Sequence, residues 1–254
     1  MKVIKILFLI QLAFIFNATA SKVIDFNFGW KFALDESKKE FYSINFDDTK
    51  WNDIRLPHDW SIDLGYTQEN TAGSNAYLPG GIGWYRKTFN YSNEWKGKKV
   101  FIYFEGVYNN YTVWINGNCL GFYPNGYLWN EYELTSYLKE GKNVITVNVN
   151  RKEYADARWY AGAGIYRNVW LRVDNKVYIP EHGVYVTTPT VTKPKAVVQI
   201  ETTVKNATSG NGKFNIRHSI INAQGETVAA IYDNAEVAAG EQGKNSCIYK
   251  YYES

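Results

Sequence analysis

Short segments of alternating apolar and polar residues, separated by turn signals, constrain this chain more than any other feature. A period of two places the apolar side chains on one face of a β-strand. Turn signals such as Asn116-Gly117 separate the segments. Helical periodicity is almost absent, and we expect only one helical turn, near Leu134 to Leu138. The pattern predicts an all-β protein built from sandwiches, with strands near residues 99–106, 109–117, 142–150, 166–173, 195–206 and 213–222.

The first twenty residues have the organisation of a secretory signal peptide. Lys2 and Lys5 come first, an apolar run covers residues 6–16, and small residues end the segment at Ala20. The rival interpretation, a membrane anchor, needs about 20 apolar residues, and this run is shorter. We therefore expect cleavage near Ala20, a secreted or periplasmic location, and no membrane contact after cleavage.

The charge balance excludes some classes of partner. The chain has 28 Lys and Arg and 25 Asp and Glu, a net charge of +3. Without Lys2 and Lys5 the balance becomes 26 basic to 25 acidic residues. A surface of this kind has no excess of positive charge for phosphates. We expect neither a nucleic acid nor an anionic membrane as a partner.

Cysteines are too few for a disulfide framework. The only two, Cys119 and Cys247, lie far apart in the sequence, and we expect both thiols to be free. The fold must therefore depend on a hydrophobic core.

Aromatic residues make up 17% of the chain. Part of this excess reflects the preference of aromatic side chains for strands. Flat apolar rings also stack on sugars, and composition alone does not separate the two explanations.

Two domains are indicated by a change of composition. All nine tryptophans lie before the polar connector that covers residues 174–180. We place the first domain at residues 21–175 and a second, immunoglobulin-like domain at residues 176–254. Only four or five strands fit into the second domain, against about seven in a complete sandwich of that type. We therefore expect an incomplete second sandwich.

No arrangement of residues in the sequence predicts catalysis, a metal site or a cofactor. The three histidines, His58, His182 and His218, are scattered, and there is no Cys-x-x-Cys, nucleophile elbow or phosphate loop. Sugar hydrolysis uses paired carboxylates, which makes Glu105 and Glu131 worth weighing. Both end or begin strands, and we expect structural hydrogen bonds for Glu105 and a strand position for Glu131.

Five motifs, in order, resemble glycoside hydrolase family 2, the family of β-galactosidases, β-glucuronidases and β-mannosidases. Together they correspond to its N-terminal sugar-binding domain, and the segment after residue 176 is similar to the start of its immunoglobulin-like domain. The family's pattern usually continues with another strand after Gly240, whereas this chain has KNSCIYKYYES at residues 244–254, so the resemblance implies an aberrant tail from about residue 241. The motifs are FNFGWKFAL (26–34), FDDTKWNDIRLPHDWSID (46–63), YLPGGIGWYRKTF (77–89), VFIYFEGVYNNYTVWINGNCLGFYPNGYLWNEYELTSYL (100–138) and RWYAGAGIYRNVWL (158–171).

The resemblance implies a fold and a division of labour. In the family the first domain is a jelly-roll β-sandwich, the second is a spacer, and a third, a TIM barrel, carries both catalytic glutamates. No barrel is present in this sequence, so no catalytic residue is assigned. The missing barrel would be the natural intramolecular partner of this chain, and the ligand would be a carbohydrate with a terminal β-linked sugar.

The loop that precedes the last motif contains the first pair of candidate binding residues. The resemblance implies that Arg158 and Trp159 reach the rim of the active site and shape the subsite for the non-reducing sugar. Arginine can donate to two hydroxyls, and indole offers a flat apolar face with one donor. The alternative is that Trp159 and Tyr160 pack under the sheet edge while Arg158 pairs with Asp156.

The motif LPHDW, residues 56–60, supplies the second candidate pair. Pro57 holds the preceding residue extended, so His58 and Asp59 are presented at the end of a strand. They could lie near the mouth of the barrel. The favoured alternative is that Asp59 caps a local turn and Trp60 belongs to the core. We also expect core positions for three further tryptophans, Trp84, Trp114 and Trp170.

Three hypotheses about function follow from these observations. The first is that the chain is the exported N-terminal fragment of a β-galactosidase-like family 2 enzyme, inactive by itself, whose full form hydrolyses terminal β-linked sugars with retention. The second is a stand-alone carbohydrate-binding module, and the third is a non-functional truncation product.

Overall fold

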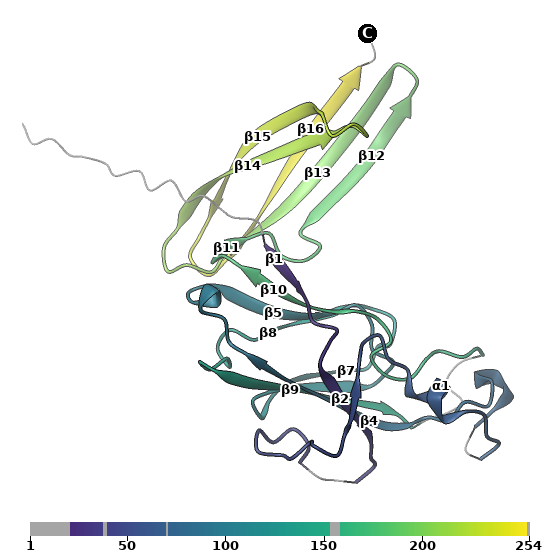
Figure 1. Cartoon of the computed structure of the whole chain (residues 1–254). Helices are drawn as coiled ribbons and strands as arrows, with labels where there is room; N and C mark the ends of the chain where they lie inside the picture. Colours follow the sequence, from purple (N-terminus) through teal and green to yellow (C-terminus); the bar gives the residue numbers. More distant parts are fainter. Residues whose placement is uncertain (1–20, 38–39, 70, 153–157, 253–254) are drawn as a thin grey trace, which may run out of the picture.

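The computed structural model describes residues 21–37, 40–69, 71–152 and 158–252, with side chains up to residue 244. The predicted signal peptide and Asp156 lie outside the described residues. Figure 1 shows two β-units in succession, the first containing strands β1 to β10 and the second strands β11 to β16. The all-β prediction is confirmed.

Antiparallel pairing assembles the first unit from two sheets. One has four strands in the order β1-β10-β5-β8, and the other has six in the order β3-β2-β4-β9-β6-β7. The strands are β1 (Lys22–Asp25), β2 (Trp30–Leu34), β3 (Asn52–Ile54), β4 (Gly81–Asn90), β5 (Lys99–Phe104), β6 (Tyr111–Ile115), β7 (Asn118–Tyr123), β8 (Asn130–Glu133), β9 (Lys142–Arg151) and β10 (Val169–Asp174).

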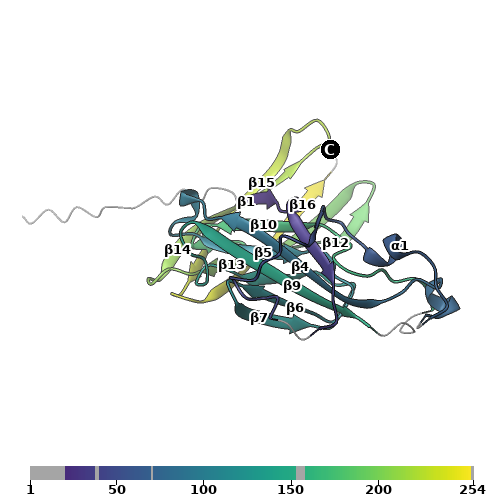
Figure 2. The same cartoon turned by 60° about the horizontal axis from the view of Figure 1, so that its bottom comes forward.

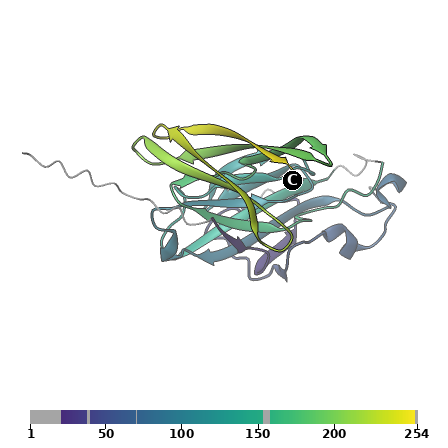
Figure 3. The same cartoon turned by 90° about the horizontal axis from the view of Figure 1, so that it is seen from above.

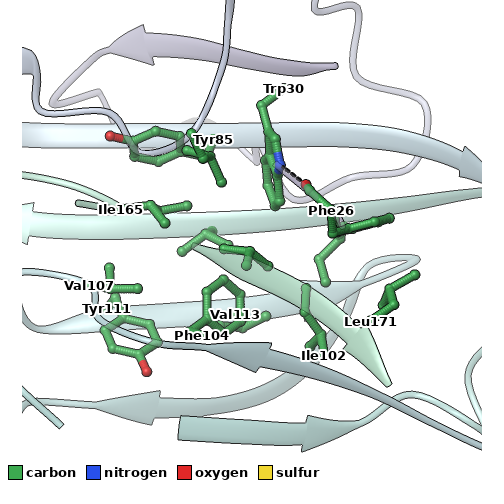
Figure 4. Packing of buried hydrophobic residues seen from close by; sticks show 14 of the residues in the cluster. Phe26, Trp30, Tyr85, Ile102, Phe104, Val107, Tyr111, Val113, Ile165 and Leu171 are labelled. Carbon is green, nitrogen blue, oxygen red and sulfur yellow. Dashed lines mark hydrogen bonds between the residues drawn. The ribbon is translucent and has the colours of Figure 1, made fainter. Parts of the chain in front are cut away.

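The core of the first unit lies between these sheets and follows from the alternation along their strands. Every second residue of β6, beginning with Tyr111 and ending with Ile115, is fully buried. Ile102 and Phe104 of β5 are also completely buried, and Figure 4 shows them packed with residues of both sheets. Burying one such side chain contributes roughly 1.5–3 kcal/mol relative to leaving it exposed.

The outer face of the six-stranded sheet is also covered, by the segment of residues 40–51. The buried Arg86 of β4 holds this segment in place. Its guanidinium contacts Asp48 at 3.0 Å and donates to the carbonyl oxygens of Phe41 and, at 3.1 Å, Ser43. Together with a contact to Thr146 at 3.3 Å, four polar contacts converge on this one buried side chain. They hold the segment against the outer face of the sheet.

This second layer corrects the predicted positions of the tryptophans. Trp84 is buried, but on the outer face, where Trp114 stacks on it with ring centroids 5.7 Å apart. Trp114 and Trp170 are only half-buried and do not belong to the interior. Alternation fixes which residues share a face, but not which face points inward. In β6 the interior received Val113 and Ile115, so Trp114 points outward.

The helices differ from the sequence prediction. Residues Leu134 to Leu138 form a hydrogen-bonded turn, with Leu138 N donating to Leu134 O at 3.2 Å, but no helix. The helices described are elsewhere and are too short to show a period of 3.6 residues: α1 (Trp60–Leu64), η1 (Gly73–Asn75) and η2 (Asn93–Trp95). Figure 2 shows α1 beyond one end of the long strands.

The second unit has a smaller core. Strand β13 pairs with β11, β12 and β16, and β14 pairs with β15 in a separate two-stranded sheet. Buried Val204, Ile216, Ala235 and Val237 form its hydrophobic cluster. Figure 3 shows the unit lying across the first when the molecule is seen from above. Its strands are β11 (Val177–Tyr178), β12 (Val184–Thr192), β13 (Lys195–Asn206), β14 (Gly212–Ile221), β15 (Thr227–Val237) and β16 (Gln242–Tyr252).

Six strands in the described part of this unit exceed the four or five predicted. The segment expected to be aberrant from about residue 241 runs as β16 and pairs with β13 in continuous register, from Gln242 opposite Lys205 to Tyr252 opposite Lys195. The tail was expected to be aberrant because it departs from the family's sequence pattern, and strand pairing in this segment does not depend on that pattern.

We predict that limited proteolysis cuts the second unit before the first. Large apolar side chains of β12, β14 and β15 are exposed, including Val191 at 69% and Tyr232 at 71%, and its small core resists local opening less. Mass spectrometry of timed digests should show early cuts after Pro180 and a persistent fragment covering residues 21–175. Equal survival of both units would contradict this expectation.

Candidate functional site

Two segments far apart in the sequence meet at the end of the first unit where α1 lies. His58 N donates to Ile165 O at 2.8 Å, and Trp60 N donates to Ala163 O at 3.3 Å. Below them the buried Tyr85 of β4 places its hydroxyl 2.9 Å from His58 Nδ1. The two predicted pairs of binding residues are therefore brought to the same end of the sandwich.

Gly164 makes this meeting possible. Its φ is +114°, and a Cβ at this position would lie 2.1 Å from the Tyr85 hydroxyl and 3.0 Å from His58 O. No other residue fits without moving the backbone or Tyr85. Close packing therefore requires a glycine at position 164. At Gly162 the requirement comes from the backbone conformation, with φ +94°.

Asp59 is the N-cap of α1 and also binds the loop. Its Oδ1 accepts a hydrogen bond from Ser61 N at 3.1 Å, and the Tyr160 hydroxyl lies 2.7 and 2.6 Å from its two oxygens. Burial raises the pKa of Asp59, while the bonds from Tyr160 and Ser61 oppose the shift. The capping role predicted for Asp59 and the core position of Trp60 are confirmed.

His58 is held in its neutral form by its surroundings. Burial lowers its pKa, and the charges of Asp63 and Asp59 oppose this effect. Burial also raises the pKa of Tyr85 well above its ordinary value, so the hydroxyl stays protonated, and it donates to or accepts from Nδ1 according to the imidazole tautomer. The other ring nitrogen, Nε2, lies 3.8 Å from Asp63.

Arg158 and Trp159 project from this anchored base. Trp159 is 61% exposed and donates from Nε1 to the Tyr127 hydroxyl at 3.2 Å. Arg158 is also exposed. The alternative in which Trp159 packs under the sheet edge is therefore wrong, and only Tyr160 turns inward. The suggested pair with Asp156 falls outside the described residues.

The two carboxylates weighed for catalysis are committed to structure. Glu105 accepts hydrogen bonds from Asn168 Nδ2 at 3.1 Å and Trp170 Nε1 at 2.8 Å, as predicted. Glu131 lies in β8 and pairs with Arg172, with Oε2 2.8 Å from Nη2.

Other kinds of site find little support in the described residues. No group of three or more His, Cys, Asp and Glu residues there could hold a metal ion. Cys119 is free and exposed, whereas the side chain of Cys247 lies outside those described. Within the same part of the chain, no helix has the length and apolar character needed to cross a membrane. A cavity of about 490 Å³, lined by Glu36, Thr67 and Lys152 among others, includes none of the four predicted site residues.

The family can now be assigned. Residues 23–174 match the model of the glycosyl hydrolases family 2 sugar-binding domain. The chain belongs to this family. The resemblance inferred from the five sequence motifs is confirmed.

Similar proteins are glycosidases much longer than this chain. A β-galactosidase of Bacteroides ovatus, BoGH2A, is 41% identical over 220 residues, covering 86% of this chain and 26% of that protein. A protein of Formosa agariphila described as a putative β-glucuronidase is 38% identical over 225 residues, covering 88% of this chain and 21% of the relative. A family 2 member from Bacteroides cellulosilyticus superposes with a TM-score of 0.84 at 30% identity, covering 91% of this chain and 30% of that structure.

The structure adds two residues that sequence reasoning did not assign to the site. Tyr160 is hydrogen-bonded to Asp59 and Tyr85 to His58. These bonds fix the base of the loop from which Arg158 and Trp159 project. The signal that could have found them is the pair of glycines in YAGAG, which indicates a close backbone approach. The roles of the four predicted residues toward a sugar stay predictions.

We expect Tyr160→Phe to lower the free energy of unfolding by about 1–3 kcal/mol, because it leaves the half-buried Asp59 carboxylate without its side-chain donor. Urea denaturation monitored by fluorescence measures the change. Tyr66→Phe, at a side chain 80% exposed, is the matched control. Equal stability of the two variants would show that the Tyr160 bond contributes nothing.

We also expect His58 to make stability depend on pH. Its pKa is lowered in the folded state, so the unfolded chain binds more protons below pH 6.5, the ordinary value. The resulting stability is present above this pH and is lost as the pH falls below it. Urea denaturation at pH 7.5 and pH 5 should show a smaller loss for His58→Gln than for wild type. His182→Gln, at an exposed histidine, should keep the wild-type loss, and an unchanged loss in His58→Gln would contradict the assignment.

Proposed function

We propose that this chain is the sugar-contacting N-terminal part of an exported, β-galactosidase-like family 2 glycosidase that releases terminal β-linked sugars from glycans. The observation that carries the proposal is the exposed pair Arg158 and Trp159, projecting from a base anchored by His58 and Asp59 in the family's sugar-binding domain. The similarity to BoGH2A supports the β-galactosidase branch.

The chain contributes binding and no chemistry. Retaining hydrolysis needs two carboxyl groups about 5–5.5 Å apart, one of them free to attack the sugar. Glu105 and Glu131 are engaged by Trp170 and Arg172. The catalytic carboxylates would come from a (β/α)8 barrel of about 250 residues, which the resemblance places after the second unit. The chain by itself is inactive in this proposal.

Arg158 and Trp159 form one wall of the sugar site. The exposed Trp159 indole, whose Nε1 donates to the Tyr127 hydroxyl, stacks on the apolar face of a pyranose. The Arg158 guanidinium donates to two neighbouring hydroxyls. Each contact replaces good interactions with water, so net gains are about 1 kcal/mol apiece. Two or three of them fall short of the roughly 4 kcal/mol that millimolar binding requires.

Export by the signal peptide of residues 1–20 completes the proposal. Lys2, Lys5 and the apolar run at 6–16 support it. The enzyme would then act on glycans in the periplasm or outside the cell.

A chimera tests the proposal directly. Residues 21–175 replace the corresponding segment of BoGH2A, and hydrolysis of nitrophenyl β-galactoside is measured. We expect an active enzyme in which Trp159→Ala lowers kcat/KM about fivefold, since about 1 kcal/mol of transition-state binding is lost. Trp129→Ala, at a tryptophan 41% exposed that stacks on Tyr103, is the matched control.

Binding and activity measurements on the isolated chain can contradict the proposal. Calorimetry of residues 21–254 with galactose, lactose and a β-linked oligosaccharide should show binding no tighter than millimolar. Micromolar binding that disappears in Trp159→Ala would favour the stand-alone binding module. Hydrolysis by the isolated chain that disappears in Glu131→Gln would overturn the assignment of chemistry to a barrel.

A further inference from the structure

A buried ion cluster at the end of β10 contains more acid than base. The Arg172 guanidinium, with a side chain 5% exposed, faces three carboxylates. Glu131 Oε2 lies 2.8 Å from Nη2, Asp174 Oδ2 lies 2.5 Å from Nη1, and Glu181 Oε2 lies 3.8 Å from Nε. One permanent positive charge therefore meets three acidic groups, of which Asp174 and Glu131 are largely buried and Glu181 is partly exposed.

Asp174 is the member with one unpaired oxygen. Its side chain is 0% exposed, and its second oxygen, Oδ1, is buried without a hydrogen bond from any described residue. Leaving a buried carboxylate oxygen without a donor is costly. Burial raises the pKa of both Asp174 and Glu131 even though Arg172 opposes the shift. The acidic groups of the cluster therefore outnumber its one cation, and a further cation would balance their charge.

The neighbouring lysines do not fill this role. Lys22 Nζ lies 2.6 Å from Glu94, and Lys99 Nζ lies 2.7 Å from Glu133. Both carboxylate partners are exposed to a greater degree than Asp174. The cation must come from another group.

Ser21 occupies the position opposite Asp174. Strands β1 and β10 are antiparallel with Lys22 opposite Val173, so the next pair is Ser21 and Asp174, with side chains on the same face. Such pairs have Cα atoms about 4.5–5.5 Å apart. The Ser21 hydroxyl lies close enough to lower the pKa of Asp174, although Oδ1 still has no hydrogen bond.

Ser21 is also the residue that follows the expected cleavage point. Hydrolysis of the Ala20–Ser21 peptide bond adds OH from water to the Ala20 carbonyl carbon and leaves the nitrogen of Ser21 as an amine. At neutral pH a second proton makes it an ammonium with three donors. Cleavage thus creates a cation on the residue that faces the unpartnered carboxylate.

We propose that Asp174, together with Glu131, is a binding site for the α-ammonium group that signal-peptide removal creates on Ser21. The proposal rests on the signal peptide of the proposed function. The new ammonium donates to Asp174 Oδ1 and reduces the excess of negative charge around Arg172. Removal of the leader therefore completes an ion cluster that the precursor leaves unbalanced.

The cluster also extends to the connector between the two units. Arg172 Nη1 donates to Ile179 O at 3.4 Å, and its guanidinium lies 5.8 Å from the ring centre of Tyr178. Binding of the mature N-terminus thus stabilises the edge strand β1 and the start of the connector together. The charged and titratable groups around the ammonium are Asp174, Arg172, Glu131, Glu181 and Tyr178, with the Lys22–Glu94 and Lys99–Glu133 pairs beyond them.

The test measures the pKa of the Ser21 α-amine in residues 21–254, prepared with a protease that leaves no additional residue. The pH dependence of amine labelling, followed by mass spectrometry of the N-terminal peptide, reports this pKa. The ordinary value is about 7.7–8.0. We expect a value at least one unit higher, so labelling at pH 7 should be at least about tenfold slower than in a free peptide of the same sequence.

Variants separate the cluster from a general effect of folding. Asp174→Asn should return the α-amine to its ordinary pKa, whereas Glu94→Gln, at an exposed carboxylate near the same strand, should not. If Asp174→Asn fails to fold, the chain that retains Ala20 should show an ordinary value, because its amine lies one residue farther away. An ordinary pKa in the wild-type chain, or equal values in Asp174→Asn and Glu94→Gln, would overturn the proposal.

The site and the export signal are tested separately. Mass spectrometry of the protein secreted from the full-length gene identifies the mature N-terminus. A terminus other than Ser21 would contradict the cleavage on which the proposal rests. The amine pKa of the prepared chain reports on the site itself.

Discussion

The close contact between residues 58–60 and 163–165 is the constraint on which the candidate site depends. Two backbone hydrogen bonds, from His58 and Trp60, join the segments, and Gly164 leaves no space between them. Tyr85 closes the contact from below. Because both segments are held against a rigid sandwich, an exposed loop can present large side chains in a defined place without a regular element of its own.

A buried carboxylate needs hydrogen-bond donors or a positive charge nearby. Asp59 in the candidate site and Asp174 near the connector meet this need to different degrees. Asp59 is half-buried and receives donors from Tyr160 and Ser61, so its charge is compensated locally. Asp174 is more deeply buried, and Arg172, which pairs with its Oδ2, is shared with Glu131, while its Oδ1 has no hydrogen bond. The Asp59 carboxylate orders a loop, whereas the Asp174 carboxylate keeps one oxygen unpaired, and the proposed α-ammonium group would occupy that place.

Sequence periodicity predicted β5, β6, β9 and β10 of the ten strands of the first unit, because alternation over five to ten residues directly reflects a sheet with one buried face. It did not predict that a second layer covers the other face, so Trp114 was placed inside. Helix α1 is one turn long and is determined by its cap, Asp59, rather than by a period. The bond between Tyr160 and Asp59 joins residues 101 positions apart, and no local pattern contains such information. The family's motifs located the loop, but not its anchors.

The segment held by Arg86 has a consequence for where the first unit can meet another molecule. One face of the six-stranded sheet packs on the core, and residues 40–51 cover the part of the other face around Trp84, Arg86 and Trp114, so this part is not available as a flat platform. Part of the aromatic excess lines this covered layer, where Phe41 contacts Trp84. These rings hold the sheet and its covering segment together, and the exposed loop residues at the rim remain the candidates for recognition.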